Sequence, residues 1–265
     1  MSNESEARGD FKQLLINKAA ETAIAVSVES IGNIDVNLDS NIPQLLQGET
    51  TSLKIVGEKI IAIKDIHLEK IDITSQNLSL NLTQAILGNI TFEQPGNFQV
   101  KLVFTQSDCD RLLNSEYVRT LLQNLSLTIA QDSASFHLQQ ADCNLEQDGK
   151  LFLITTIVLN REQQIKTARF KIAFEFYQAG LGIKFIGGQY LENKTLDLDE
   201  TVAIMNKVRD LLYLRDFANE DLALKVTGIK IEERQLMIEC NTQIKKLPNS
   251  ISQSIQSVTS KLNDY

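Results

Sequence analysis

The chain has 265 residues, 43% of them hydrophobic, with 26 lysines and arginines against 34 aspartates and glutamates. A chain of this length buries a sizeable core without disulfides or metal ions, and only three prolines and twelve glycines argue against a disordered or linker-rich protein. The net charge of −8 argues against non-specific binding of DNA or RNA and against simple electrostatic docking on anionic lipid headgroups.

The ends of the sequence show no targeting or membrane-spanning signal. Residues 1–10 are polar and acidic and are predicted to be disordered, and no run of 18 apolar residues occurs. The three cysteines, Cys109, Cys143 and Cys240, are odd in number and far apart, which is typical of a reducing compartment. We expect a cytoplasmic protein, or one attached peripherally to an internal membrane face.

The N-terminal part is predicted to begin with an amphipathic helix from Phe11 to about Glu29. Strand-like segments then follow, with two short helical turns among them that are stopped by Gly48 and Gly88. The predicted strands of this part are Asn33–Leu38, Thr51–Val56, Lys59–Ile63, Ile66–Thr74, Asn77–Leu82 and the cleanly alternating Phe98–Phe104.

A second helix is predicted next, with Ser107 as its N-cap three residues before Asp110, and it should run to about Asn124. Strand patterns then resume, and the clearest is Arg169–Tyr177, in which four apolar side chains share one parity. The predicted strands here are Leu125–Ala130, Ser135–Cys143, Leu151–Leu159, Gln164–Tyr177 and, between turns at Gln178–Gly180 and Gly187-Gly188, Leu181–Ile186.

Asp197 or Asp199 is predicted to cap a third substantial helix that extends through Leu214. Two further strands, Leu222–Ile231 and Leu236–Ile244, complete the folded part. Residues 11–247 are thus predicted to form a single domain, followed by an amphipathic C-terminal helix within residues 248–265.

Consecutive strands, interrupted by only a few helices, predict an α+β fold with mainly antiparallel pairing. The alternation gives most strands one apolar and one polar face. About a dozen strands share few covering helices, so three arrangements stay open: the apolar face packs on the protein's own helices, the sheet closes on itself, or part of the face forms a groove for an apolar ligand.

No catalytic or metal-binding constellation can be assembled from the sequence. The only histidines, His67 and His137, have no second ligand at useful spacing, and Cys109 lies between two aspartates that oppose thiolate formation. A hydrolase would need a nucleophile–base pair, and the sequence offers no such pair. We therefore expect no enzyme activity, no metal and no cofactor.

Several stretches resemble the LmeA-like phospholipid-binding family. They are Leu45-Leu46-Gln47-Gly48, Leu53-Lys54-Ile55-Val56-Gly57, Lys64-Asp65-Ile66-His67-Leu68, Leu78–Gly88, Thr105–Ser115 and Leu211–Phe217. The resemblance spans approximately Phe11 to Leu247. It implies a long curved sheet wrapped on long helices, similar to tubular lipid-binding domains, with an apolar groove for acyl chains and no catalytic residues. The chain departs from exported members in lacking a signal peptide or lipoprotein cysteine, which favours the cytoplasmic side.

The preferred hypothesis is a non-enzymatic protein that binds, and in a stronger form transfers, phospholipid or another acyl-chain ligand, with peripheral membrane contact. The parity of the strands assigns the groove to Phe98, Phe104, Leu153, Ile157, Phe170, Phe174 and Phe176, with Leu14 and Leu15 as a lid. The alternative is a structural or adaptor protein with a fully self-packed sheet, whose amphipathic terminal helices recruit an unknown protein partner.

Overall fold

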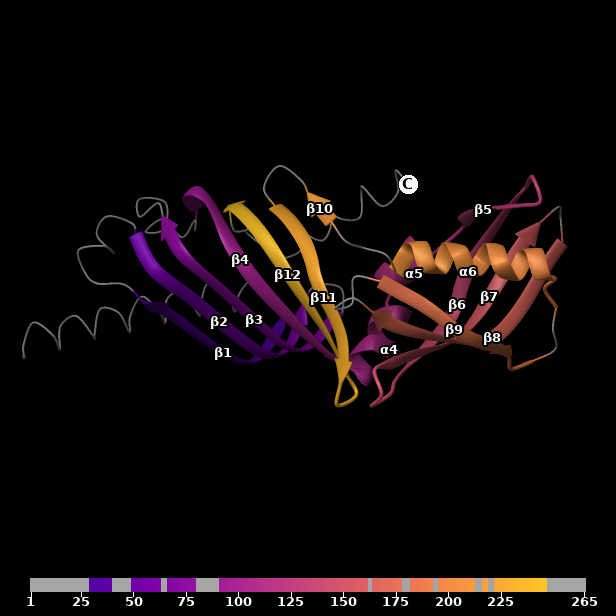
Figure 1. The fold of residues 1–265 in the computed structure, drawn as a ribbon, viewed down its shortest axis with the longest axis horizontal. Helices are drawn as coiled ribbons and strands as arrows, with labels where there is room; N and C mark the ends of the chain where they lie inside the picture. The colour runs from indigo at the N-terminus through magenta and orange to yellow at the C-terminus, as the bar shows by residue number, and fades with distance from the viewer. Residues whose placement is uncertain are drawn as a thin grey trace, which may run out of the picture.

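Two antiparallel β-sheets dominate the computed structural model of the chain and lie end to end along its long axis (Figure 1). The structure describes residues 29–39, 49–62, 66–79, 91–161, 164–177, 182–192, 195–212, 216–218 and 222–246. The predicted N-terminal helix up to residue 28, the two short helical turns and the predicted tail helix Ser250–Asn263 lie outside the described residues. The mainly antiparallel pairing of the strands is confirmed, but the strands form two sheets instead of the one long sheet that was expected.

The first sheet combines the two ends of the folded region. Its strand order is β1-β2-β3-β4-β12-β11-β10, so β4 pairs with β12 and joins an N-terminal block of four strands to a C-terminal block of three. The sheet is visibly curled in Figure 1. Its strands are β1 Ser30–Asp39, β2 Glu49–Ala62, β3 Ile66–Ser79, β4 Thr91–Thr105, β10 Asp216–Ala218, β11 Leu222–Glu232 and β12 Gln235–Lys246.

Two breaks predicted inside this sheet are absent, because β2 and β3 each run unbroken for 14 residues. In β2 the irregularity is confined to Lys59, at a φ of 52°. Gly57 stays in the strand, where a Cβ atom would lie only 3.0 Å from Ile60 Cδ1 and 3.1 Å from Ile71 Cγ2. In β3 the polar stretch around Ser75 resembles a turn, yet the strand continues through it. The Ser75 hydroxyl is buried and donates to the carbonyl of Asn97.

The second sheet is a meander in which every strand pairs with its sequence neighbours, in the order β5-β6-β7-β8-β9. The strands are β5 Leu125–Ile129, β6 Asp132–Leu145, β7 Lys150–Arg161, β8 Gln164–Tyr177 and β9 Gly182–Tyr190. The alternation in β8 is confirmed, since Ala168, Phe170, Ile172 and Phe174 are buried and their neighbours are more exposed.

The predicted turn at Gly187-Gly188 is wrong. Both glycines lie inside β9 and pair with Ala173 and Ile172 of β8. A bulge leaves Ile186 as the extra residue, so β9 continues to Tyr190 instead of ending at Ile186.

Three helices belong to the described residues: α4 Gln106–Asn114, α5 Glu116–Leu121 and α6 Leu198–Leu212. None of them is a long helix of the kind that the family resemblance implies. Thr105, not Ser107, caps α4, because its hydroxyl accepts from the Asp108 amide while the Asp108 carboxylate accepts from the Thr105 amide. The single helix predicted to Asn124 breaks at Ser115, whose extended backbone ends α4 and caps α5. None of the described helices is long and apolar enough to cross a bilayer.

Helix α4 protects the edge of β6 that β5 leaves uncovered. Gln106, Asp110 and Asn114, spaced four residues apart, accept from the backbone amides of Leu145, Cys143 and Ala141, which are spaced two apart. Four helical residues rise about 6.0 Å and two strand residues about 6.8 Å, so the two ladders match closely. The helix thus takes the place of a neighbouring strand.

Most of the buried apolar residues form three clusters. The first lies between the second sheet and α6, and the second lies on the β1–β4 part of the first sheet. The third joins the two sheets around α4 and includes Phe104 of β4, Cys109 of α4, Leu145 of β6 and Ile231 of β11. Contacts in this junction cluster hold the two sheets together.

Candidate functional site

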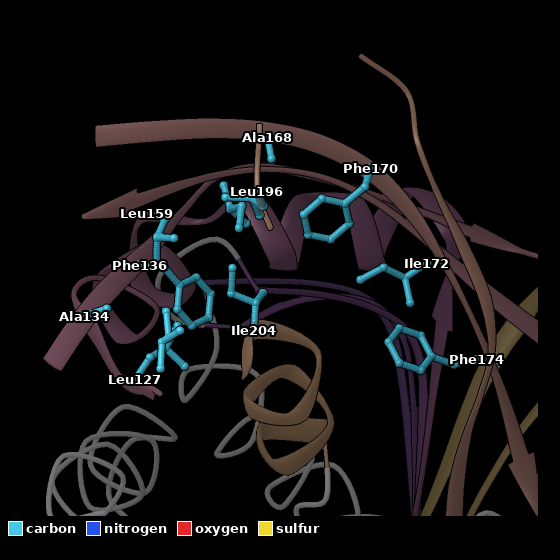
Figure 2. Packing of buried hydrophobic residues seen from close by; sticks show 12 residues of the cluster. Leu127, Ala134, Phe136, Leu159, Ala168, Phe170, Ile172, Phe174, Leu196 and Ile204 are labelled. Atoms are coloured by element: carbon cyan, nitrogen blue, oxygen red, sulfur yellow. The ribbon is translucent and has the colours of Figure 1, made fainter. Parts of the chain in front are cut away.

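The first cluster holds the largest group of the predicted groove residues. Phe170 and Phe174 of β8 and Ile157 of β7 are almost completely buried there, and the half-buried Leu153 packs against them. Figure 2 shows Phe170 and Phe174 pointing from the sheet toward Ile204 of α6. These four residues therefore form one apolar surface under the helix.

The remaining predicted residues lie elsewhere. Phe98 belongs to the cluster on the first sheet, and Phe104 and Phe176 belong to the junction cluster around α4. Leu14 and Leu15 lie outside the described residues. The structure thus distributes the predicted set over three clusters, and their contact with a ligand stays a prediction.

An aromatic path leads from the buried surface under α6 to solvent at the edge strand β9. Phe185 stands opposite Phe174, with ring centroids 6.3 Å apart in an edge-to-face arrangement. Tyr190 stands opposite Phe170 in the same way, at 6.1 Å. Phe174 is 2% exposed whereas Phe185 is 47% exposed, so the path ends at the surface.

Sequence reasoning missed Phe185 and Tyr190 as site residues. Ile183 and Phe185 are two residues apart, so strand alternation places both on the same apolar face and could have identified Phe185. Alternation could not predict the face on which Tyr190 lies, because the bulge at Ile186 shifts the parity of the last part of β9.

Helix α6 covers the apolar surface and is fastened at its N-terminus. The carboxylate of Glu200, 1% exposed, accepts from Lys166 Nζ at 2.7 Å and from the Asp197 amide at 2.9 Å, and it lies 3.7 Å from Arg161. Asp197 in turn accepts from the Glu200 amide, so the predicted cap at Asp197 is confirmed. At its flank, the Thr201 hydroxyl contacts the Tyr190 hydroxyl at 2.6 Å.

A second kind of site is a polar hollow beside β6. It has a volume of about 560 Å³ and is lined by Asn114, Arg119, Gln139, Gln140 and Thr156. No apolar side chain is among these, so the hollow differs in character from the predicted groove.

The described part of the chain contains no group of three or more potential metal ligands. Its three thiols are buried and free. Hydrogen bonding with the Cys109 thiol and burial raise the pKa of Cys143, and burial raises the pKa of Cys240 to about 11. Both shifts disfavour the thiolate that a nucleophilic cysteine requires.

Comparisons with known proteins give one match. The model of the LmeA-like phospholipid-binding family matches residues 11–241. No curated protein and no solved structure matches significantly, so the similarity to tubular lipid-binding domains stays a prediction.

Proposed function

Because the chain belongs to the LmeA-like phospholipid-binding family, we propose that it binds the acyl chains of phospholipid between α6 and the β8–β9 side of the second sheet. The observation that carries this placement is the aromatic path from exposed Phe185 to buried Phe174. An edge strand with a half-exposed phenyl ring offers an acyl chain a first contact, and the surface under α6 extends it inward.

The available energy suits such a ligand. Each methylene that leaves water contributes ~0.8 kcal/mol, so ten methylenes contribute ~8 kcal/mol. That sum corresponds to roughly micromolar affinity. A short apolar track lined by Phe170, Phe174 and Phe185 is therefore sufficient once α6 moves away from the sheet, because Phe170 and Phe174 are buried beneath it.

The proposal includes finer statements. The protein acts by binding and not by bond cleavage, it exchanges phospholipid with a membrane, and it does so from the cytoplasm at an internal membrane face. Transfer is measured with fluorescent phospholipid in donor vesicles and unlabelled acceptor vesicles, and location by fractionation of cells. The adaptor alternative relied on the terminal helices, which lie outside the described residues.

The first test is extraction of the purified protein with organic solvent, followed by mass spectrometry. We expect co-purified phospholipid and uptake of a fluorescent phospholipid from micelles. A lipid-free extract together with no uptake contradicts the proposal.

The second test locates the binding surface with a matched pair of variants. Phe185→Ala removes the exposed ring at the end of the aromatic path, and we expect uptake to weaken about tenfold, equivalent to ~1.4 kcal/mol. Ile165→Ala is the control, because Ile165 is 74% exposed on β8 with the opposite parity to Phe170 and Phe174. Equal uptake by both variants rules out this surface even if the protein binds lipid elsewhere.

A further inference from the structure

The polar hollow arises from an irregularity in the second sheet. Strand β5 pairs with β6 only from Leu125 opposite Phe136 to Ile129 opposite Asp132, and the side chains of α4 cover β6 from Ala141 onward. Between the part of β6 that pairs with β5 and the part that α4 covers, the strand has a bulge with Gln139 as the extra residue. The hollow of about 560 Å³ lies at this uncovered bulge.

Its five lining side chains are all hydrogen-bonding groups, and Arg119 provides the only charge among them. Asn114 is held in place, because its amide nitrogen donates to the carbonyls of Ala141 and Asp110 while its oxygen accepts from the Ala141 amide. Gln140 and Thr156 stand opposite each other on β6 and β7. The Gln140 amide also donates to the Asp142 carboxylate at 3.2 Å, so one carboxylate contacts the lining from outside it.

Arg119, like the exposed Arg234, differs from three other arginines of the described chain. Arg161 pairs with Asp132 at 2.7 Å, Arg169 lies 3.7 Å from Glu192, and Arg111 contacts His67. No hydrogen bond or ion pair of the Arg119 guanidinium is found among the described residues, and the side chain is exposed. In a chain of net charge −8, a guanidinium beside a hollow with no carboxylate in its lining is a candidate site for an anion.

We propose that the polar hollow binds the phosphate group of a phosphate ester, with Arg119 paired to the phosphate oxygens and the amides of Gln139 and Gln140 as further donors. Guanidinium presents several N–H donors in a planar fork that matches phosphate geometry. The hollow is open to solvent, and its volume of about 560 Å³ leaves room for a phosphoglycerol-sized group. The hollow lies on the opposite face of the second sheet from the surface under α6, because Thr156 pairs with Arg169 whereas Thr155 pairs with Phe170. The phosphate is therefore that of a soluble phosphate ester, and this inference goes beyond the proposed function.

The experiment uses the full chain and three probes: inorganic phosphate, glycerol 3-phosphate and short-chain dihexanoyl phosphatidic acid, with glycerol as the uncharged control. Binding is followed by NMR, in which the side-chain amide resonances of Gln139, Gln140 and Asn114 report on the hollow. We expect glycerol 3-phosphate to shift these resonances and the short-chain lipid to bind no more tightly, because the lining of the hollow offers its acyl chains no apolar side chain. Arg119→Gln should weaken both by tenfold or more.

Arg234→Gln is the matched control, since Arg234 is exposed at the turn between β11 and β12 and the substitution removes the same charge. It should leave both affinities unchanged. Equal binding to Arg119→Gln and wild type, or equal shifts with glycerol and glycerol 3-phosphate, overturns phosphate recognition.

The probes separate this inference from the proposed function. Lipid uptake without any response of the three amide resonances overturns the phosphate site and leaves phospholipid binding intact. A response to glycerol 3-phosphate with no lipid uptake overturns the proposed function and upholds the phosphate site. If inorganic phosphate binds as tightly as both esters, the site recognises free phosphate and its assignment to a phosphate ester is wrong.

Discussion

Replacing Glu200 tests how α6 is fixed over the apolar surface of the second sheet. Its carboxylate is 1% exposed and joins Lys166 of β8 to the first turn of α6. Glu200→Ala removes both connections and leaves the Lys166 ammonium beside an apolar cluster. Glu200→Gln keeps an oxygen for the Asp197 amide and removes only the charge.

The cost follows from the separate contacts. A hydrogen bond to a charged group contributes ~1.5–3 kcal/mol and a helix cap ~1 kcal/mol, so Glu200→Ala should lower the free energy of unfolding by about 3 kcal/mol. The side chains of Lys166 and Arg161 are 28% and 22% exposed, so water can partly replace the lost partner, and the cost stays at the low end for a broken buried ion pair. Glu200→Gln should cost about 1–2 kcal/mol, because the charged bond is weakened and the cap survives.

The measurement is urea unfolding of wild type and both variants at neutral pH, followed by far-ultraviolet circular dichroism. The reasoning predicts the order wild type, Glu200→Gln, Glu200→Ala in decreasing stability. If Glu200→Ala unfolds within about 0.5 kcal/mol of wild type, the range of ordinary surface substitutions, the carboxylate does not fasten the helix.

Three further predictions concern the core and the junction between the sheets. Ile204→Ala should cost about 3 kcal/mol of unfolding free energy by urea titration, because Ile204 is 0% exposed at the centre of the first cluster; a change below 1 kcal/mol would contradict its packing. Burial raises the pKa of Asp110, so its contribution to stability is present below the unfolded pKa and is lost as the pH rises through the folded pKa. Wild type should therefore gain stability relative to Asp110→Asn as the pH falls from 7 toward 4, and a pH-independent difference would show that the carboxyl is not perturbed. A hydrogen bond with the Cys109 thiol and burial raise the pKa of Cys143, and burial raises the pKa of Cys240. Both thiols should therefore resist an aromatic disulfide reagent near pH 8 and react after unfolding. Rapid labelling of the native protein would contradict their burial.

The strands of the second sheet could be predicted because each pairs with its sequence neighbours and buries one face. In β8 the parity of Phe170, Ile172 and Phe174 alone identified the buried side. The first sheet depends on the pairing of β4 with β12, over 100 residues apart, and alternation in either strand carries no information about its partner. For that reason the strand pattern alone does not distinguish two sheets from one.

The missed details arise from local hydrogen bonds that compete with simple patterns. Two plausible caps, Thr105 and Ser107, lie two residues apart, and only the reciprocal bonds with Asp108 select Thr105. The glycines in β9 resemble a turn, yet the backbone of β8 holds them in the strand. The polar hollow was invisible in the sequence, because its lining comes from α4, α5, β6 and β7 and its shape depends on one bulge.

The burial of Phe170 and Phe174 has a consequence for lipid binding under α6. At 4% and 2% exposure these rings can meet an acyl chain only when α6 moves away from the sheet. A ligand that binds such a minor state has its apparent affinity reduced by the fraction of that state.

Weakening the Glu200 attachment by about 1.4 kcal/mol should raise the open fraction about tenfold, so Glu200→Gln should accelerate uptake of fluorescent phospholipid while it lowers stability. Val36→Ala, a core substitution in the first sheet, destabilises the protein without touching α6 and serves as the control. If both variants accelerate uptake equally, general loosening explains the effect; if Glu200→Gln leaves the rate unchanged, lipid does not enter beneath α6.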